Sequence, residues 1–297
     1  MLPFIDLHSQ FKRIQAEVEE RVTTVLRSGQ YILGPEVSEF EDKLAEFAKV
    51  KHAISCSSGT DALIIALMAK GVGPGDAIFT TPFTYFATAE VIALLGATPI
   101  FVDIDISTFN IDPSALKSAI LALKKCDTSN NALPKWPLEE LRSLKPKGII
   151  TVDLFGLPAD HDRINLIAAD HGLFVLEDAA QGFGGEVNGR CAGTLAEVGC
   201  TSFFPAKPLG CYGDGGALFT NDDDLASLFR SIRVHGRGID KYENVRLGIT
   251  GRLDALQAAV LMAKLSIFPD ELKSRQRVAL TYERLISTSN LEIITPK

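Results

Sequence analysis

Apolar positions follow two different spacings along the chain. Residues 10–28 repeat apolar side chains at the spacing of an amphipathic helix that ends at Gly29, and a second such helix follows a turn at Gly34-Pro35. Farther along, short apolar runs alternate with helical segments. The pattern predicts strands at 52–56, 77–81, 98–105, 147–156, 173–180, 199–204 and 216–220, and helices at 60–71, 84–96, 112–125, 162–172, 222–236, 252–268 and 270–287.

Strands such as "GIITV" and "LFVLE" are continuous apolar runs. Such runs are typical of a mainly parallel sheet with helices on both faces, so we predict an α/β fold. Residues 126–143, which hold a polar cluster and two prolines, predict a surface insertion. Residues 291–297 look like the start of a strand, which suggests that the sequence is cut short.

The composition narrows the class of protein. The 297 residues are 46% hydrophobic and 23% charged, as in soluble globular proteins, and the net charge of −7 argues against nucleic acid or an anionic membrane as a partner. We find no signal peptide, and no apolar run reaches the roughly 18 residues of a membrane span. Five cysteines without a CxxC pair favour reduced, buried thiols in the cytoplasm.

Several motifs of known chemistry are missing. The five histidines are scattered, without HExxH or a paired spacing, so we predict no metal site. The acidic run at 221–224 is interpreted as a helix start. Without G-x-S-x-G or G-x-G-x-x-G, neither a serine hydrolase nor a common dinucleotide-binding fold is predicted.

The stretch "FFPAKPLG", residues 203–210, places one lysine, Lys207, among apolar side chains. Burying a lone ammonium is costly unless it is paired or loses its proton, and a deprotonated lysine is a nucleophile. Taken alone, a lysine between two prolines is better explained as a surface residue. Its interpretation therefore depends on the other motifs.

Two of these motifs also follow predicted strands. In "SSGTDAL" the first amides of a helix lack internal partners, and Gly59 and Thr60 suit a phosphate there, although an ordinary N-cap is an equally good interpretation. Glu177-Asp178 ends another apolar strand. An aspartate at that edge can face a cation such as a protonated pyridine nitrogen, or it can serve as an N-cap or in a salt bridge.

Together, the phosphate loop, Asp178 and Lys207 favour a site for pyridoxal phosphate (PLP), with Lys207 as the Schiff-base lysine and Asp178 on the ring nitrogen. Tyr85 follows another strand and could stack on the ring, whereas core packing better explains Phe83. The basic segment 230–252 could bind an anionic substrate, although a solvated surface is the simpler interpretation for most of its arginines.

The motifs resemble those of the DegT/DnrJ/EryC1/StrS family of sugar aminotransferases. Within the family, the chain is most similar to the WbpE/WlbC type. Those enzymes use glutamate to aminate the 3-keto group of a UDP-linked 2-acetamido-2-deoxy-glucuronic acid for bacterial surface polysaccharide (O-antigen). The resemblance rests on "SSGTDAL", "SGQYILGPEV", "TYFATAEVIALLGATPIFVDID", "LEDAAQGFGG", "TSFFPAKPLGCYGDGGALFTND" and "RLDALQAAVL".

The family resemblance implies a fold-type I PLP enzyme. Such an enzyme has a large domain with a seven-stranded, mostly parallel sheet, a small C-terminal domain, and a homodimer with its sites at the interface. Here 1–250 would be the large domain with an N-terminal helical arm, and 251–297 the start of a truncated small domain. Glutamate and a UDP-linked keto sugar would be the substrates, and 2-oxoglutarate the first product.

The resemblance also implies a role for each matching residue. Lys207 matches the Schiff-base lysine, Asp178 the partner of the ring nitrogen, and Gln181 the neighbour of the ring hydroxyl. Tyr85 matches the stacking aromatic, and Arg252 a position that binds the sugar nucleotide. The phosphate contacts match Gly59, Thr60 and Ser202.

Two departures from the family pattern keep alternatives open. Thr250 stands where the family usually has an asparagine that reaches the phosphate of the neighbouring subunit, and family members continue beyond residue 297. One alternative is an aminotransferase that acts at C4 of a nucleotide sugar; the related dehydratases are disfavoured, because they carry histidine in place of Lys207. The other alternative is a truncated, non-catalytic PLP-binding protein.

Overall fold

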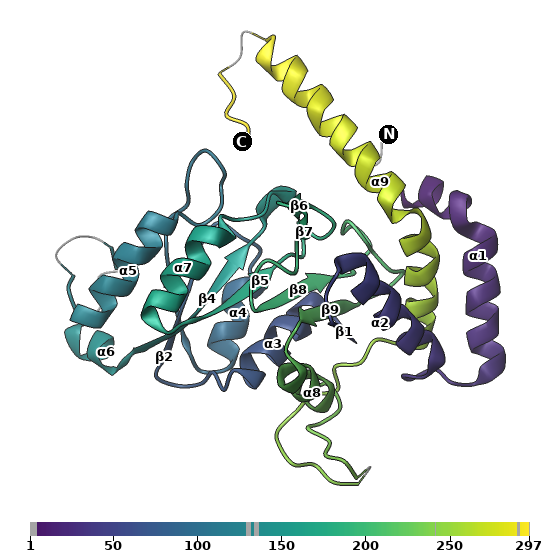
Figure 1. Cartoon of the computed structure of the whole chain (residues 1–297), viewed down its shortest axis with the longest axis horizontal. Helices are drawn as coiled ribbons and strands as arrows, with labels where there is room; N and C mark the ends of the chain where they lie inside the picture. Colours follow the sequence, from purple (N-terminus) through teal and green to yellow (C-terminus); the bar gives the residue numbers. More distant parts are fainter. Residues whose placement is uncertain (1–4, 129–131, 134–136, 241, 290–291, 297) are drawn as a thin grey trace. The chain divides into compact units, whose positions relative to one another are not determined.

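The structure, a computed structural model, describes residues 5–128, 132–133, 137–240, 242–289 and 292–296 (Figure 1). Within these residues the main sheet has seven strands in the order β1-β9-β8-β5-β4-β2-β3. The pairs β2–β3, β2–β4, β4–β5 and β5–β8 are parallel, and β1–β9 is antiparallel. The predicted α/β fold with a mostly parallel seven-stranded sheet is confirmed.

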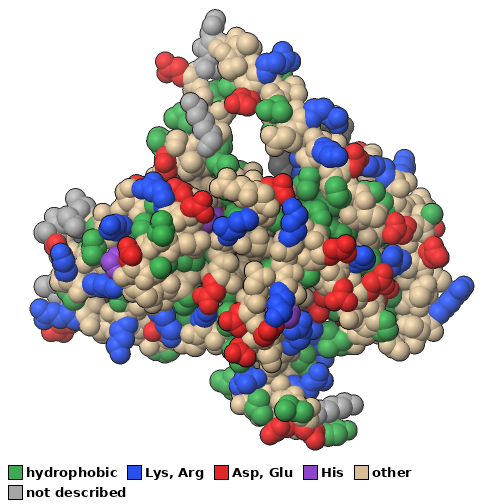
Figure 2. All heavy atoms as spheres, in the orientation of Figure 1, with side chains coloured by type: hydrophobic (Ala, Val, Ile, Leu, Met, Phe, Trp, Pro, Cys, Tyr) green, Lys and Arg blue, Asp and Glu red, His purple; other side chains and the backbone are tan. Residues whose placement is uncertain are grey.

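The chain forms two compact units, which we describe separately. Unit 1 comprises Met1–Ala62 and Thr201–Ile293, and unit 2 comprises Leu63–Cys200 and Ile294–Lys297. On the face drawn in Figure 2, acidic and basic side chains are interspersed. None of the described helices is both long and apolar enough to cross a membrane.

Unit 2 contains the parallel strands. Apolar residues of these strands pack against helices of the same unit, and Phe79, Leu116, Ile149 and Ile164 share one buried cluster. The strands are β2 (Asp76–Thr80), β3 (Thr98–Phe101), β4 (Lys145–Val152), β5 (Phe174–Asp178), most of β8 (Val198–Ser202), β6 (Glu186–Val187) and β7 (Arg190–Cys191). The helices are α4 (Ala87–Leu94), α5 (Pro113–Lys125), α6 (Leu138–Ser143), the 3-10 helix η1 (Leu154–Gly156) and α7 (His161–His171).

Unit 1 combines an antiparallel strand pair with long helices. Helices α1 and α9 lie side by side (Figure 1), and Ile14, Val18, Val260 and Ala263 form a buried cluster there. The strands are β1 (His52–Cys56) and β9 (Gly216–Thr220). The helices are α1 (Leu7–Ser28), α2 (Pro35–Ala48), α8 (Asp223–Ile232) and α9 (Ala255–Ser287), and α3 (Gly59–Ala69) begins here and continues into unit 2.

Three predictions about elements are corrected. Residues 252–268 and 270–287 do not form two helices, because α9 runs through Pro269; an interior proline costs about 3 kcal/mol, and the packing of the preceding turn, where Phe268 is fully buried, offsets this cost. No strand forms within 292–296, since an apolar run needs a pairing strand. Leu133 and Leu141, in the predicted surface insertion, are buried in the apolar cluster of unit 2, while 129–131 and 134–136 lie outside the described residues.

Other local predictions are confirmed. Asp222 begins α8 as an N-cap, accepting hydrogen bonds from the N–H groups of Asp224 and Leu225 at 2.8 and 3.0 Å. The acidic run at 221–224 is therefore a helix start. The cysteines that are buried, as predicted, are Cys56, Cys191, Cys200 and Cys211.

Candidate active site

The predicted phosphate loop lies in unit 1, where β1 ends and α3 begins. Ser58 Oγ accepts a hydrogen bond from the N–H of Asp61 at 3.0 Å, so Ser58 caps the helix. Gly59 lies against Ser202: a Cβ added at Gly59 would lie 2.6 Å from the Cβ of Ser202, a distance that real side chains essentially never show. Gly59 and Ser202 are therefore brought together beside a helix N-terminus, with Thr60 in its first turn.

Lys207 lies in the loop between β8 and β9, also in unit 1. Backbone hydrogen bonds fix the loop, from Lys207 N–H to Phe204 O at 2.8 Å and from Phe203 N–H to Gly215 O at 2.7 Å. The Lys207 side chain is half-buried. Its predicted apolar surroundings are present in part, since Phe203 is fully buried and Phe204 is 52% exposed.

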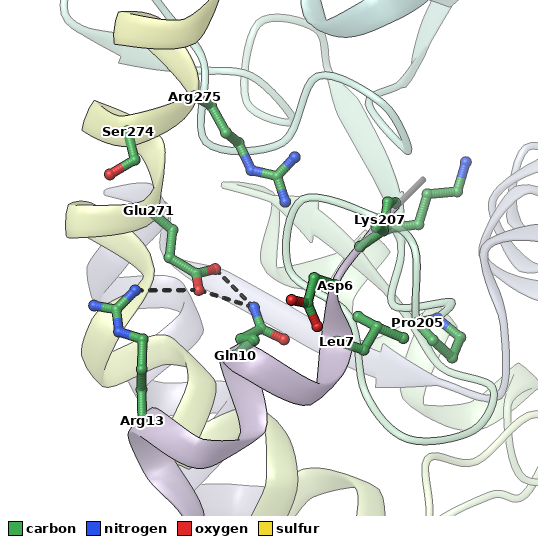
Figure 3. Close-up of a pocket in the computed structure, with 10 residues that line it drawn as sticks. Asp6, Leu7, Gln10, Arg13, Pro205, Lys207, Glu271, Ser274 and Arg275 are labelled. Atoms are coloured by element: carbon green, nitrogen blue, oxygen red, sulfur yellow. Dashed lines mark hydrogen bonds and ion pairs between the residues drawn. The ribbon is translucent and has the colours of Figure 1, made fainter. Parts of the chain in front are cut away.

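A cavity of about 240 Å³ adjoins Lys207 and is lined mainly by α1 and α9 (Figure 3). Gln10 Nε2 donates to both carboxylate oxygens of Glu271, at 2.8 and 3.0 Å, and Arg13 Nη1 lies 3.7 Å from one of them. Figure 3 shows Arg275 reaching into the same space, while the Lys207 ammonium points away from it. No pattern in the sequence indicates this cavity, because its residues are far apart along the chain.

Asp178 ends β5 in unit 2 and is only 8% exposed. The hydroxyl of Thr88 donates to its Oδ2 at 2.9 Å, and the backbone N–H of Ala180 donates to its Oδ1 at 3.1 Å. Each Asp178 oxygen thus accepts one hydrogen bond and keeps a lone pair for a further donor. A buried carboxyl held in this way is suited to an N–H group of a ligand.

Two further buried carboxyls, those of Asp153 and Glu177, form a pair in unit 2 that sequence reasoning missed. Glu177 accepts hydrogen bonds from the N–H groups of Gly193 and Leu195, at 2.6 and 2.7 Å, and His161 Nε2 lies 3.1 Å from Asp153 Oδ1. Burial raises the pKa of Asp153 to about 7 and the pKa of Glu177 to about 8. Burial lowers the pKa of His161. Near neutral pH the pair therefore holds protons that exposed carboxyls would have lost.

The ligand atoms of Asp153, His161 and Glu177 lie within 4.8 Å of one another, an arrangement that could hold a metal ion. Their spacing along the chain carries no metal motif, so nothing local in the sequence indicates the cluster. Both oxygens of Glu177 already accept backbone hydrogen bonds.

Tyr85 and Gln181 also belong to unit 2. Tyr85 precedes α4 and is 69% exposed, so its ring is accessible. Gln181 Oε1 accepts a hydrogen bond from the N–H of Phe155 at 3.0 Å. Phe83 packs edge-to-face on Phe109 and Phe155, with ring centroids 6.2 and 6.0 Å away, but it is 46% exposed, so the prediction that it packs in the core is wrong.

In the basic segment 230–252, the solvated-surface interpretation is wrong for Arg233. This residue is 7% exposed, and its Nη1 donates to Glu41 and to the backbone carbonyl of Ser55, the latter at 2.6 Å. A guanidinium cannot be deprotonated in a protein, so it can be buried only with acceptors around it. Arg233 is therefore a structural residue of unit 1.

Thr250 and Arg252 lie at the other end of this segment, also in unit 1. Thr250 Oγ1 is 2.7 Å from His235 Nε2, and Thr250 pairs with Val234 in an isolated β-bridge. Arg252 is half-buried. Contacts of either residue with a neighbouring subunit or a sugar nucleotide stay predictions.

Known proteins resemble this chain over nearly its whole length. The UDP-2-acetamido-2-deoxy-3-oxo-D-glucuronate aminotransferase of Pseudomonas aeruginosa is 50% identical over 296 residues, which cover 100% of this chain and 76% of that protein. A DegT DnrJ EryC1 StrS aminotransferase from Brucella abortus, known from a crystal structure, has a TM-score of 0.90 at 49% identity and covers 97% of this chain and 73% of its own. NtdA from Bacillus subtilis, crystallised with bound cofactor PMP, has a TM-score of 0.72 at 30% identity over 86% of this chain and 53% of its own.

The family model agrees with these individual similarities. It describes the DegT/DnrJ/EryC1/StrS aminotransferase family and matches residues 12–296. This range includes every residue predicted to contact the cofactor or substrate. The chain belongs to the DegT/DnrJ/EryC1/StrS aminotransferase family.

Proposed function

We propose that this chain is a PLP-dependent aminotransferase that transfers the amino group of glutamate to a keto sugar nucleotide. The proposed acceptor is the 3-keto group of a UDP-linked 2-acetamido-2-deoxy-glucuronic acid, used for bacterial surface polysaccharide. One observation carries the proposal: the nearly buried Asp178 carboxylate holds a hydrogen-bond donor on each oxygen, in a chain of an aminotransferase family.

Each unit holds described residues that suit one part of PLP. In unit 1, the absence of a side chain at Gly59 permits the close approach to Ser202 at a helix N-terminus, where the amides can bind a phosphate. In unit 2, the Asp178 carboxylate suits a pyridine N–H. When bound, PLP supplies an electron-poor ring that stabilises the negative charge left on a carbon after its proton is removed.

The site residues then have separate tasks. Lys207 would hold the cofactor through its side-chain amine, and the same amine would serve as the base and acid that moves a proton at the substrate carbon. Asp178 keeps the ring nitrogen protonated, Gln181 contacts the ring hydroxyl, and Tyr85 stacks on the ring. The phosphate is bound by Gly59, Thr60 and Ser202.

The proposal extends to assembly and domain organisation. The working enzyme is a cytoplasmic homodimer, in which Thr250 contacts the phosphate in the neighbouring subunit and Arg252 binds the sugar nucleotide. Residues 1–250 form the large domain, and 251–297 begin the small domain. The proposed sugar substrate is supported by the relative in Pseudomonas aeruginosa, whose name specifies a UDP-linked 3-oxo sugar.

The test uses the chain with PLP and glutamate. The wild-type protein should show the visible absorbance of lysine-bound PLP, lose it when glutamate is added, and release 2-oxoglutarate. Lys207→Ala should keep the far-ultraviolet circular dichroism but lose both the absorbance and turnover. If Lys207→Ala aminated a keto sugar at the wild-type rate, the proposed function would be wrong. A non-catalytic PLP-binding protein would instead keep its absorbance in the presence of glutamate.

The substrate is tested separately. A panel of UDP- and dTDP-linked 3-keto and 4-keto sugars should show the highest kcat/KM for the UDP-linked 3-keto uronic acid. A preference for a 4-keto sugar would contradict the proposed carbon while leaving the aminotransferase reaction intact.

A further inference from the structure

Two threonines lead to the Asp178 carboxylate in unit 2. Thr88, in the first turn of α4, is fully buried, and its Oγ1 lies 2.9 Å from Asp178 Oδ2. Thr84 precedes the helix and is half-buried, and its Oγ1 lies 3.0 Å from the Oγ1 of Thr88. The two hydroxyls therefore meet although Thr84 lies outside the helix.

The direction of the first hydrogen bond is fixed, since Thr88 Oγ1 donates to Asp178 Oδ2, and this uses the single hydroxyl proton of Thr88. The Thr88 oxygen is then available as an acceptor for the proton of Thr84. The hydroxyls therefore align in the order Thr84, Thr88, Asp178, and each bond polarises the next.

The two oxygens of Asp178 are fixed by different parts of unit 2. Thr88 approaches Oδ2 from α4, while the backbone N–H of Ala180 approaches Oδ1 from the chain just after β5. Donors on both oxygens hold the carboxylate plane in one orientation. Removing the Thr88 hydroxyl takes away the donor that α4 contributes to Oδ2.

We propose that Thr88 is a positioning residue: its hydroxyl holds the Asp178 carboxylate ionised and correctly oriented for the ring nitrogen of PLP, and Thr84 orients that hydroxyl. The inference rests on the proposed function. Thr88 itself does not touch the cofactor or the substrate. Its effect passes through Asp178 to the ring, which must stay protonated to withdraw electrons.

The variants separate the hydroxyl from the packing of Thr88. Thr88→Val keeps the shape and removes the hydroxyl, whereas Thr88→Ser keeps the hydroxyl and removes the methyl group. Thr84→Val removes only the second hydrogen bond, at a half-buried position. A merely structural role would make Ser and Val similarly harmful, and the harm would appear in the melting temperature.

Three measurements are made on each variant. One is the affinity of the cofactor-free protein for PLP. Another is the single-turnover rate with glutamate, and the third is the pH midpoint at which the absorbance of lysine-bound PLP changes. Thr88→Val should weaken PLP binding and slow the glutamate step, each by about tenfold to a hundredfold, the range for a lost hydrogen bond to a charged group. Thr88→Ser should stay within about threefold of wild type, and Thr84→Val should fall between the two.

The pH midpoint gives the readout that packing does not move. In Thr88→Val it should rise, because a less electron-poor ring lets the chromophore hold its proton to higher pH. An unchanged midpoint and rate in Thr88→Val, in a wild-type protein that binds PLP and reacts with glutamate, overturn the inference and leave the proposed function standing. If Thr88→Val does not fold, Thr84→Val takes its place: a pH midpoint equal to that of the wild-type protein would then overturn the inference about Thr88. A wild-type chain that binds no PLP overturns the proposed function itself.

Discussion

Units 1 and 2 bury their charged groups in different ways. In unit 1, Arg233 cannot lose its proton, and it is buried against the carboxylate of Glu41. In unit 2, the carboxyls of Asp153 and Glu177 are fully buried with His161 beside them, and burial raises the pKa of Asp153 to about 7 and that of Glu177 to about 8. The comparison teaches that a buried guanidinium, which keeps its proton, needs a permanent acceptor, whereas a buried acid can be neutralised by a proton.

The largest effect is expected from breaking the pair in unit 1. Arg233→Met leaves Glu41 without its cation and Ser55 O without its donor. The free energy of unfolding should therefore be lower than that of the wild-type protein by about 3 to 5 kcal/mol. Urea denaturation at constant pH measures this difference. Adding Glu41→Gln to Arg233→Met should restore part of the stability. A double variant no more stable than the single one would show that lost packing, and not a stranded charge, is responsible.

In unit 2 the corresponding experiment is a change of pH. The pKa values of Asp153 and Glu177 are higher in the folded protein than in the unfolded chain, so the folded state keeps protons that the unfolded state has lost. This contribution is fully present below about pH 4 and is lost as pH rises through about 7 and 8, with a slope of at most about 1.4 kcal/mol per pH unit for each proton. Between about pH 6.5 and 8.5 the free energy of unfolding should therefore fall by roughly 2 kcal/mol.

Isosteric amides test the source of this pH dependence. Asp153→Asn and Glu177→Gln should each flatten the slope between about pH 6.5 and 8.5, since neither amide titrates there. His161 contributes a smaller slope of opposite sign near the lower limit, because burial lowers its pKa and only the unfolded chain holds part of a proton there. A slope that survives in the double variant would contradict the assignment to these carboxyls.

A smaller loss of stability is expected from adding a methyl group at Gly59, a position of unit 1 that has no room for a side chain. In Gly59→Ala the new methyl group would meet the Cβ of Ser202, so we expect a loss of roughly 1 to 2 kcal/mol and weaker PLP binding. Gly73→Ala is a matched control, since the nearest atom to its new Cβ is 4.0 Å away. Urea denaturation and PLP titration of both variants measure the effect, and equal behaviour of the two would rule out steric overlap as its cause.

The smallest effect should come from an exposed ion pair of unit 1. Lys43 and Glu46 lie 2.9 Å apart on α2, with side chains 55% and 72% exposed. Lys43→Gln should leave the free energy of unfolding essentially unchanged, because solvent screens such pairs. A loss comparable to that of Arg233→Met would remove burial as the explanation of the contrast between the two.

Much of the fold could be predicted because its signals are local. The continuous apolar runs of β4 and β5 indicated a parallel sheet, and Asp222 indicated a helix start. The prediction that the helix ends at Pro269 was wrong, because a local rule does not include the packing that keeps α9 helical on both sides of the proline. Leu133 and Leu141 were missed for a similar reason, because a polar segment can still anchor two apolar side chains in a core.

Some residues of the candidate site could be predicted from local sequence, and others could not. Lys207, Asp178 and Gly59 stand in recognisable local motifs, and the combination of these motifs is enough to predict PLP. Thr88 is unremarkable in the sequence, and only the fold brings its hydroxyl to a carboxylate 90 residues away. The pairing of Asp153 with Glu177 could not be predicted either, because the two residues are 24 positions apart in the sequence.

By itself, the amino-acid sequence determined the α/β class, the family and the residues proposed to act on the cofactor, because all of these are encoded in short stretches with their own chemistry. Tertiary structure alone decided which acids are buried together, which arginine is structural, and which hydroxyl holds Asp178. These properties depend on how far a group lies from water and from other charges, and both distances are set only when remote segments pack.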